Sequence, residues 1–422
     1  MTDLAHTPQE LLSRLESTKQ ASRQLNAASP GTRDAALAAL AEGLAADAEQ
    51  IVAANVLDLE RGVRDGMTQG LQDRLRLTPQ RVEGLVDAVK VIASLPDPLG
   101  HVVREMTLAN GLEVSQVRVP FGVIGAIYEA RPNVTVDITA LALKSGNAVA
   151  LRGGSAALET NKALVEIMHR ALESVGLPAA IVASVDDYGR VGANALMTGR
   201  GLIDVLIPRG SAALIETVVT QSTVPVIETG AGVVHIFVDA SADPVSTAQI
   251  VHNAKVQRPS VCNSVETVLL HREALEGVLP GMVAKLLESG VTIHADDTVC
   301  ALVPDAVAAT PEVWGREALS LDISLKVVDS LDEALEHIHT YSTGHTESIL
   351  TSDSDNAERF VHEVDSAAVM VNASTRFTDG GEFGFGAEVG ISTQKLHARG
   401  PMGLPELTST KWIVRGNGHV RA

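Results

Sequence analysis

The chain has 422 residues, more than one hydrophobic core usually serves, so we expect at least two domains. Lys and Arg number 33 against 52 Asp and Glu, and the resulting net charge of −19 argues against a nucleic-acid binder or a polybasic membrane-surface protein. Hydrophobic residues make up 45% and aromatic residues only 3%, so the cores must be aliphatic and a base-stacking surface is not expected.

Cysteine usage and the N-terminal segment indicate the compartment. Cys262 and Cys300 are too few for a disulfide framework, and no CxxC motif is present, so no metal site is predicted. Residues 1–16 lack the apolar core of a signal peptide, and no run approaches the ~18 apolar residues of a membrane span. We therefore predict a cytoplasmic protein with reduced thiols.

The first ~95 residues are expected to be helical. Residues 35–60 repeat apolar positions at helical spacing, and Thr78-Pro79 is a typical helix start. Residues 101–108 and 112–119 then resemble two strands joined by Asn110-Gly111, a strong hairpin signal. This hairpin is either an ordinary surface element or an arm for oligomerisation.

From Pro120 onward, short β-branched runs alternate with helical ones, which predicts mainly parallel sheets covered by helices on both faces. A Gly-rich segment, residues 228–232, separates two sets of such runs, so we predict an α/β protein of two doubly wound domains in series. The expected strands of the first set are 122–127, 148–152, 181–185, 204–208, 224–227 and 234–238. Those of the second set are 267–271, 291–294, 325–328, 348–351 and 368–372.

Cys262 is the candidate nucleophile. It lies in a proline-containing loop between an expected helix, residues 244–256, and a strand that starts near Glu266. A cysteine at the carboxyl edge of a sheet is well placed for attack, and the nearby Lys255 and Arg258 would favour its thiolate form. The alternative is a buried core cysteine.

Cys300 and Glu228 have different surroundings. Cys300 lies in an apolar stretch, residues 298–303, and is interpreted as a packing residue. Glu228 is followed by Thr-Gly-Ala-Gly, and these small residues allow a ligand or another chain segment to approach closely. Glu228 is therefore either a general base or a solvated loop carboxylate.

Two Gly-containing turns follow expected strands and suit a phosphate. Gly210-Ser211 leads into an expected helix, residues 212–220, whose free N–H groups attract anions, although Ser211 would serve equally as a plain N-cap. Arg152 precedes Gly-Gly-Ser155 in a similar turn and offers a guanidinium group. No GxGxxG fingerprint is present.

Residues 371–388 form a long, polar, Gly-rich loop that we expect to be functional, because it carries three of the chain's few aromatic residues. Three isolated cations lie in such loops, and each is either a binding residue for anionic substrate groups or an ordinary surface arginine. They are Arg131, Arg258 and Arg376.

Four stretches together resemble the signature of the γ-glutamyl phosphate reductase (glutamate-5-semialdehyde dehydrogenase) family, in the expected order over nearly the whole chain. They are VPFGVIGAIYEARPNVT (119–135), QRPSVCN (257–263), VNASTRFTDGGEFGFG (371–386) and STQKLHARGPMGL (392–404). This family belongs to the aldehyde dehydrogenase superfamily. The resemblance implies an oxidoreductase that uses NADPH to reduce γ-glutamyl phosphate to glutamate 5-semialdehyde and phosphate, the second step of proline biosynthesis.

The resemblance also implies site residues. Cys262 matches the superfamily nucleophile, Glu228 the water-activating Glu, and Gly210-Ser211 the turn beneath the cofactor pyrophosphate. Arg152 and Ser155 match the segment at the adenosine ribose. An acidic residue is common there in NAD-dependent members, so Ser155 together with Arg152 favours NADPH.

Two further matches are weaker. Glu317 corresponds to the Glu that holds the nicotinamide ribose. The superfamily's Pro-Trp-Asn element is missing, so either Arg131 or Asn133 would stabilise the oxyanion.

The expected domains are a cofactor domain (1–227) with hairpin arm 101–119, a catalytic domain (228–390), and a tail (391–422) that returns to the cofactor domain and serves oligomerisation. A homo-oligomer is expected, and docking of a glutamate 5-kinase is left open. The alternative function is oxidation of a small semialdehyde by an NAD(P)-dependent aldehyde dehydrogenase. A cysteine hydrolase and a catalytically inactive scaffold are less favoured, because no positioned His accompanies Cys262 and both cofactor turns are intact.

Overall fold

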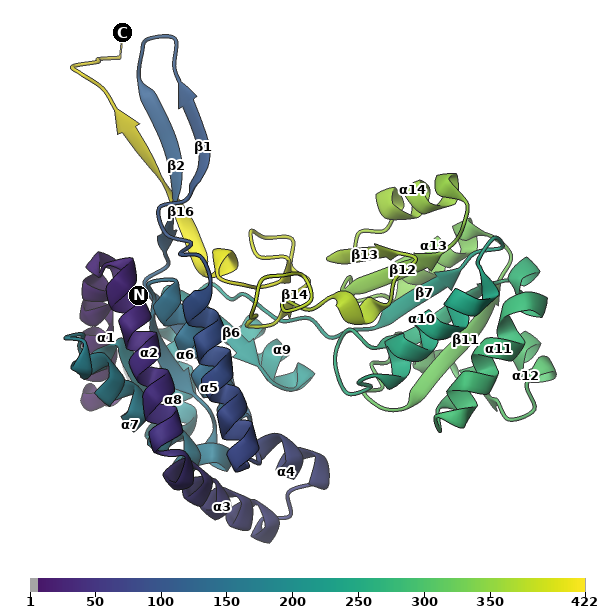
Figure 1. Cartoon of the computed structure of the whole chain (residues 1–422), viewed down its shortest axis with the longest axis horizontal. Helices are drawn as coiled ribbons and strands as arrows, with labels where there is room; N and C mark the ends of the chain where they lie inside the picture. Colours follow the sequence, from purple (N-terminus) through teal and green to yellow (C-terminus); the bar gives the residue numbers. More distant parts are fainter. Residues whose placement is uncertain (1–6, 422) are drawn as a thin grey trace. The chain divides into compact units, whose positions relative to one another are not determined.

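The computed structural model describes residues 7–421, and these divide into two compact units (Figure 1). The first unit runs through Thr229 and also contains Gly384–Gly390 and the chain from Met402 onward. The second contains Gly230–Phe383 and Ile391–Pro401. None of the described helices combines the length and the apolar character that crossing a bilayer requires.

The first unit begins with helices that bury an apolar stripe. Ser29 caps α2 by accepting from the Thr32 N–H, and Thr78 caps α5 in the same way from Arg81. The periodic segment predicted over 35–60 is two helices, because α2 ends before Asp47 and α3 starts after it. The helices are α1 (Gln9–Ala27), α2 (Pro30–Ala46), α3 (Ala48–Arg64), α4 (Gln69–Leu75) and α5 (Pro79–Ser94).

A four-stranded parallel sheet of order β5-β4-β3-β6 forms the core of this unit. All six residues of β3 are buried, as expected for a strand covered on both faces. Its strands are β3 (Val123–Tyr128), β4 (Ala148–Arg152), β5 (Val182–Ser184) and β6 (Val205–Arg209). Its helices are α6 (Pro132–Lys144), α7 (Leu158–Ser174), α8 (Gly189–Thr198) and α9 (Ala212–Gln221), with short 3-10 turns at Ser155–Ala157, Ala179–Ile181 and Asp186–Tyr188.

The strand predicted at 224–227 is wrong: only an isolated bridge, Leu206 to Val226, forms there. Pro225 has no N–H to give to a ladder, which limits pairing at this position. The strand predicted at 234–238 forms with these bounds, but it belongs to the other set: it is β7 (Val234–Val238) of the second unit's sheet.

The predicted hairpin is present as β1 (Val102–Thr107) and β2 (Glu113–Pro120), paired antiparallel. In its turn only Gly111 has a positive φ, of 89°. β2 pairs on its other side with β16 (Thr408–Arg415) along its whole length, which gives a three-stranded arm extending from the first unit (Figure 1).

The second unit is built on a seven-stranded sheet of order β10-β9-β11-β8-β7-β12-β13, in which every pair is parallel. Its strands are β7 (Val234–Val238), β8 (Val265–His271), β9 (Thr292–Ala295), β10 (Val307–Ala308), β11 (Asp322–Val328), β12 (Thr346–Leu350) and β13 (Ala368–Val371). Its helices are α10 (Pro244–Val256), α11 (Leu275–Glu288), α12 (Asp297–Leu302), α13 (Leu331–Tyr341) and α14 (Ser354–Glu363).

Alternate strand residues feed two separate cores. Ile236 and Val238 join the cluster beneath α10 and α11, whereas Phe237 joins the cluster beneath α13 and α14. The helices therefore cover both faces of the sheet (Figure 1).

The predicted return of 391–422 to the first unit needs correction. A short hairpin of β14 (Ile391–Ser392) and β15 (Gly400–Pro401) belongs to the second unit, where Gly230 N donates to Ile391 O at 3.0 Å. Only the chain from Met402 returns to the first unit. Short 3-10 turns lie at Arg272–Ala274, Pro311–Gly315, Thr375–Phe377 and Pro405–Leu407.

Candidate active site

In the second unit, Cys262 lies half-buried in the loop that connects α10 to β8. Lys255, in the last turn of α10, joins the two ends of this loop, because its Nζ donates to Val265 O at 2.8 Å and to Glu266 Oε2 at 3.1 Å. Lys255 is 0% and Glu266 3% exposed. The expectation that Lys255 favours the thiolate of Cys262 is thus revised, since its ammonium is directed at the carbonyl and carboxylate of the loop's far end.

Burial opposes both charges of this pair. It raises the pKa of Glu266 to about 7 despite the opposing field of Lys255, and it lowers the pKa of Lys255 although Glu266 raises it. Asp322 and Arg316 act on Lys255 in opposite directions. The pair therefore holds the loop at a considerable desolvation cost, as buried ion pairs do.

The backbone of Gly232 packs directly against that of Cys262. A Cβ built on Gly232 would lie 1.5 Å from the Cys262 carbonyl oxygen, so only glycine fits. The Gly232 N–H donates to Glu317 Oε1 at 2.8 Å. The close approach predicted for the small residues after Glu228 is thus confirmed at Gly232, and it brings Glu317 to the same place.

Arg376, in the long Gly-rich segment 371–388, contacts the loop that carries Cys262. Its Nε donates to Gln257 Oε1 at 2.7 Å and its Nη1 to Asn263 Oδ1. Burial lowers the pKa of Arg376, and the charge of Asp379 raises it. Arg258 lowers the same pKa further, whereas Cys262 and Glu382 raise it. The structure thus brings together Cys262, Arg258 and Arg376, of which Arg258 is the most exposed.

Asn263 fixes the same segment on its other side. Its Nδ2 donates to Thr378 O at 2.8 Å, and Thr375 Oγ1 donates to Asn263 O at 2.8 Å. Phe377 and Phe383 remain 49% and 42% exposed. Gln257 and Asn263 lie within the recognised motif, but no spacing in the sequence pairs them with Arg376.

The first unit holds the two predicted phosphate turns. Ser211 caps α9 through Leu214 N, and its N–H and Oγ lie 3.4 and 3.2 Å from Glu129 Oε2. A Cβ on Gly210 would come within 3.0 Å of the same oxygen. A carboxylate thus occupies the N-terminus of α9, which shows that this helix end attracts an anion. Glu129 lies in the stretch 119–135 that carries the family resemblance, but the sequence does not indicate its contact with Ser211.

The second turn contains Arg152, whose Nε is buried without a hydrogen-bond partner among residues 7–421. Gly154, which follows it, has a φ of 77°. Ser155 is exposed, and its carbonyl accepts from Arg61 Nη2 at 2.8 Å. Asp186 accepts from the Gly153 N–H at 2.6 Å, and burial raises its pKa. Arg61 and Asp186 are remote in sequence, so no local motif indicates them.

Asn133 and Arg131 lie where β3 ends and α6 begins. Ala130, between the strand and Arg131, has a φ of 46°, a left-handed conformation that a non-glycine residue adopts only under strain. Asn133 is exposed, and its Nδ2 donates to Asp137 Oδ2 at 3.1 Å. Glu228 is half-buried near the end of the first unit's main segment.

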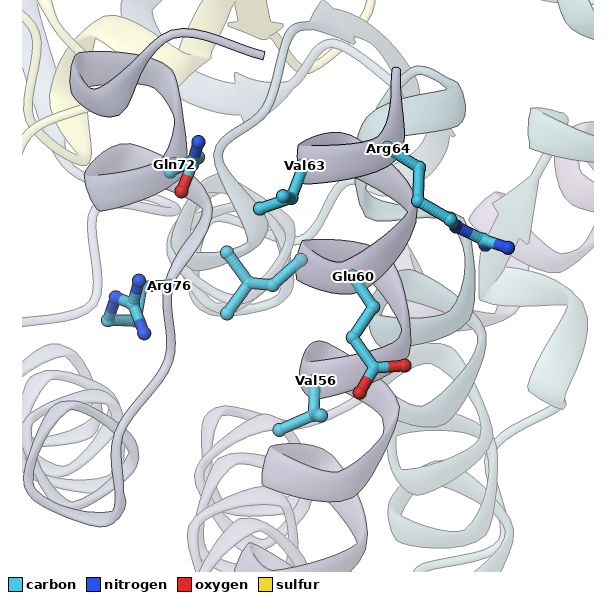
Figure 2. Close-up of a pocket in the computed structure, with 7 residues that line it drawn as sticks. Val56, Glu60, Val63, Arg64, Gln72 and Arg76 are labelled. Carbon is cyan, nitrogen blue, oxygen red and sulfur yellow. The ribbon is translucent and has the colours of Figure 1, made fainter. Parts of the chain in front are cut away.

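Three other features of residues 7–421 lie apart from the predicted site residues or give no metal site. A surface pocket between α3 and α4 contains none of the predicted site residues (Figure 2), and it is lined by Val56, Leu59, Glu60, Val63, Arg64, Gln72 and Arg76. Cys300 packs in α12, where its Sγ lies 3.4 Å from Ala295 O. In the described part of the chain, no three His, Cys, Asp or Glu side chains gather closely enough to hold a metal ion.

The chain has two α/β units, each built on a parallel sheet. One unit has glycine turns at the ends of its strands, and the other carries a cysteine loop. This combination is typical of the aldehyde dehydrogenase class. The model of the aldehyde dehydrogenase family matches residues 5–308. A crystal structure of an acetylating aldehyde dehydrogenase from Geobacillus thermoglucosidasius, 17% identical, has the same fold, with a TM-score of 0.70 over 98% of each chain.

Within that class, the chain belongs to the γ-glutamyl phosphate reductase family. It is 62% identical to the γ-glutamyl phosphate reductase of Leifsonia xyli subsp. xyli over 99% of both chains, and 54% identical to that of Thermobifida fusca over 100% of both. The crystal structure of the Thermotoga maritima γ-glutamyl phosphate reductase, 46% identical, covers 98% of this chain and is itself covered completely, with a TM-score of 0.95.

These findings confirm the predicted family and fold class. Membership of the aldehyde dehydrogenase family implies an oxidoreductase with a nicotinamide cofactor and a small-molecule substrate.

Proposed function

We propose that the chain reduces L-γ-glutamyl 5-phosphate to L-glutamate 5-semialdehyde with NADPH and releases phosphate, as the second step of proline biosynthesis. Relatives named γ-glutamyl phosphate reductase match it over its full length. The observation that carries the proposal is the Cys262 loop, held against the Gly232 backbone beside the guanidinium of Arg376. That arrangement holds a cation on the loop that carries the thiol, which suits a substrate with an anionic acyl phosphate.

In the first chemical step, the Cys262 thiolate attacks the acyl carbonyl carbon. The carbon–oxygen bond to phosphate breaks, phosphate leaves with the electron pair, and a thioester forms on Cys262. Arg258 and Arg376 attract the phosphate and stabilise its departing charge. The developing oxyanion accepts from the Cys262 backbone N–H and from Asn133 or Arg131.

When bound, the cofactor supplies a hydride to the thioester carbon. The resulting tetrahedral carbon then loses its bond to sulfur, which restores the Cys262 thiolate and releases the aldehyde. No water enters this sequence, so Glu228 contributes less than it does in a relative that oxidises aldehydes to acids.

The first unit is the proposed cofactor domain and the second the proposed catalytic domain. Gly210 and Ser211 would hold the pyrophosphate, because they lie at the N-terminus of α9 and Gly210 leaves no room for a Cβ. Arg152, with its unpaired buried Nε, and the uncharged Ser155 suit the 2′-phosphate of NADPH. Glu317 would hold the nicotinamide ribose with the carboxylate oxygen that Gly232 does not use.

The arm supports a proposed homo-oligomer. All six residues of β1 are exposed, and its apolar side chains together with those of β16 remain uncovered. These residues are Val102, Val103, Met106, Trp412 and Val414. An uncovered sheet with such residues is typical of an interface between copies of one chain. A glutamate 5-kinase that delivers the labile acyl phosphate directly is a further proposed partner.

The test is phosphate- and NADP⁺-dependent oxidation of glutamate 5-semialdehyde. Cys262→Ala should abolish it, whereas Cys300→Ala, the matched cysteine control, should retain it. Glu228→Gln should keep much of the activity. Equal and complete loss in Cys262→Ala and Glu228→Gln would contradict the division of roles. Oxidation that proceeds equally well without phosphate would instead support the alternative, an aldehyde dehydrogenase acting on a small semialdehyde.

A further inference from the structure

Asp137 is a carboxylate within α6 that the proposed mechanism does not use. It stands four residues after Asn133, one helical turn further along the same face, and accepts from the Asn133 amide at 3.1 Å. Asp137 itself is half-buried, and its neighbours Val136 and Ile138 are 0% and 1% exposed. A carboxylate here is costly to bury unless it meets a positive group.

Arg209, the last residue of β6, provides positive charge near Asp137. A Cβ on Gly390 would come within 2.5 Å of Arg209 Nη1, so this glycine makes room for the guanidinium. The Nε of Arg209 is buried and has no hydrogen-bond partner among residues 7–421. A buried guanidinium N–H without a partner remains able to donate to an acceptor.

The carboxyl group of Asp137 is ionised at neutral pH. Burial raises the pKa of Asp137 to about 6, while the Asn133 hydrogen bond and the Arg209 charge both lower it. Above that pH the carboxylate is ionised. The first unit therefore holds a half-buried negative group and a half-buried positive group whose charges act on each other. Arg209 pairs across the sheet with Tyr128, the last residue of the strand that leads into α6.

We propose that Asp137 and Arg209 bind the amino-acid end of the substrate: Asp137 receives the α-ammonium group and Arg209 the α-carboxylate. This inference rests on the proposed function and deepens it. A γ-glutamyl compound carries both charges on one carbon, and a carboxylate and a guanidinium whose charges act on each other are complementary to such a zwitterion.

The spacing along α6 fits the length of the substrate. Four covalent bonds separate the reacting carbonyl carbon from the amino nitrogen. The Asn133 amide and the Asp137 carboxylate lie 3.1 Å apart, so a substrate of this length can contact one with each of its ends. Asn133 is a candidate for the oxyanion at the carbonyl. Asp137, one turn further, then faces the other end of the same short chain.

Three aldehydes test the proposal in the oxidative direction with phosphate and NADP⁺: glutamate 5-semialdehyde, 5-oxopentanoate, which lacks the amino group, and 4-aminobutanal, which lacks the carboxylate. We expect Asp137→Asn to lower kcat/KM about 100-fold for the two amino aldehydes and less than about threefold for 5-oxopentanoate. Variant-to-wild-type ratios for each aldehyde cancel the fraction present in open-chain form.

Arg209→Met should show the complementary pattern. It should lower kcat/KM for the two carboxylates and spare 4-aminobutanal, with the KM for NADP⁺ unchanged. A raised KM for NADP⁺ would assign Arg209 to the cofactor instead and overturn its half of the proposal. Asp34→Asn is the matched control, since Asp34 pairs with Lys144 at the far end of α6, and it should leave all three ratios near one.

A different role for Asp137 has a distinct signature. If Asp137 serves only to orient Asn133, Asp137→Asn will lower kcat equally for all three aldehydes, and the proposal is wrong. If the wild type oxidises none of them with phosphate and NADP⁺, the proposed function fails, and this inference fails with it. Circular dichroism and urea unfolding of each variant separate these outcomes from misfolding.

Discussion

The α-carbon of Gly232 faces the carbonyl oxygen of Cys262 so closely that a methyl group on it would lie 1.5 Å from that oxygen. The sequence carries this relationship as one small residue in a Gly-rich segment thirty positions before the cysteine. Its consequence is that the position of Cys262, the proposed nucleophile, depends on a residue that has no side chain and takes no part in the proposed chemistry.

Gly232→Ala should therefore displace the Cys262 loop. We expect a cost of about 3 kcal/mol or more in the free energy of unfolding, because backbone and not a flexible side chain must move. The activity should be lost, and the rate of Cys262 alkylation should change. Urea unfolding and iodoacetamide kinetics measure both effects.

Gly281→Ala is the control for that substitution. Gly281 lies within α11, and a Cβ there meets nothing within 4 Å. Alanine is the better helix former by about 1 kcal/mol, so this variant should be as stable as the wild type or more stable, and fully active. Equal effects of the two alanines would contradict the assigned role of Gly232.

Ser155→Glu tests the proposed cofactor preference. A carboxylate beside the proposed 2′-phosphate site should repel NADPH by about 1–2 kcal/mol, a 5- to 30-fold rise in its KM, and leave NADH little affected. Ser17→Glu, on the exposed face of α1, controls for the added charge. An unchanged NADPH-to-NADH ratio would remove Ser155 from the cofactor site.

Glu317 has one observed contact and one proposed role, and substitution can separate them. One carboxylate oxygen accepts from the Gly232 N–H at 2.8 Å, and Gln can do the same. Glu317→Gln should keep the wild-type unfolding free energy while raising the KM for NADPH. Glu317→Ala leaves a buried N–H unpaired and should also cost about 1–3 kcal/mol of stability. If Glu317→Gln leaves the KM unchanged, the ribose assignment is wrong.

His345 makes the stability of the second unit depend on pH. Burial lowers its pKa to about 4 from the usual 6.5, so below pH 6.5 the unfolded chain binds a proton that the folded chain does not. Stability should fall as the pH drops from 6.5 to 4, by about 3 kcal/mol in total from this group.

His345→Gln should reduce this slope by one proton, whereas His362→Gln, at an exposed position of α14, should not. Urea unfolding midpoints at pH 7 and pH 5 provide the measurement. Identical slopes in the wild type and His345→Gln would show that the buried imidazole is not neutral in the folded state.

Local sequence features predict most of the elements of this fold. The helix over residues 244–256 and the strands at 148–152 and 234–238 lie where the periodicity placed them, because a short β-branched run next to an amphipathic one admits few other structures. The break at Asp47 was missed, since helical spacing continues across it. The assignment at 224–227 failed because an apolar run outweighed the missing N–H of Pro225.

The site was predictable only where its residues lie in one motif. Cys262 and Ser211 can be proposed as site residues from the sequence of their own loops. Three other features join segments that are distant in the sequence, so no local pattern indicates them. They are the contact of Gly232 with Cys262, the ion pair of Lys255 with Glu266, and the effect of the Arg209 charge on Asp137. The contact of Asp137 with Asn133 has one local signal in the sequence, the spacing of four residues that puts the two side chains one helical turn apart.

The arm begins early in the chain and is completed at its end. Gln116 in β2 bonds to Thr410 in β16, 294 residues later, so β2 lacks its second partner until the C-terminal segment has been made. At about 5–20 residues per second of synthesis, the first two strands wait roughly 15–60 s with one edge open. In a nascent chain, the open edge of β2 therefore waits for its partner for more time than any other strand edge that later becomes paired. Misassembly during translation would start at this edge.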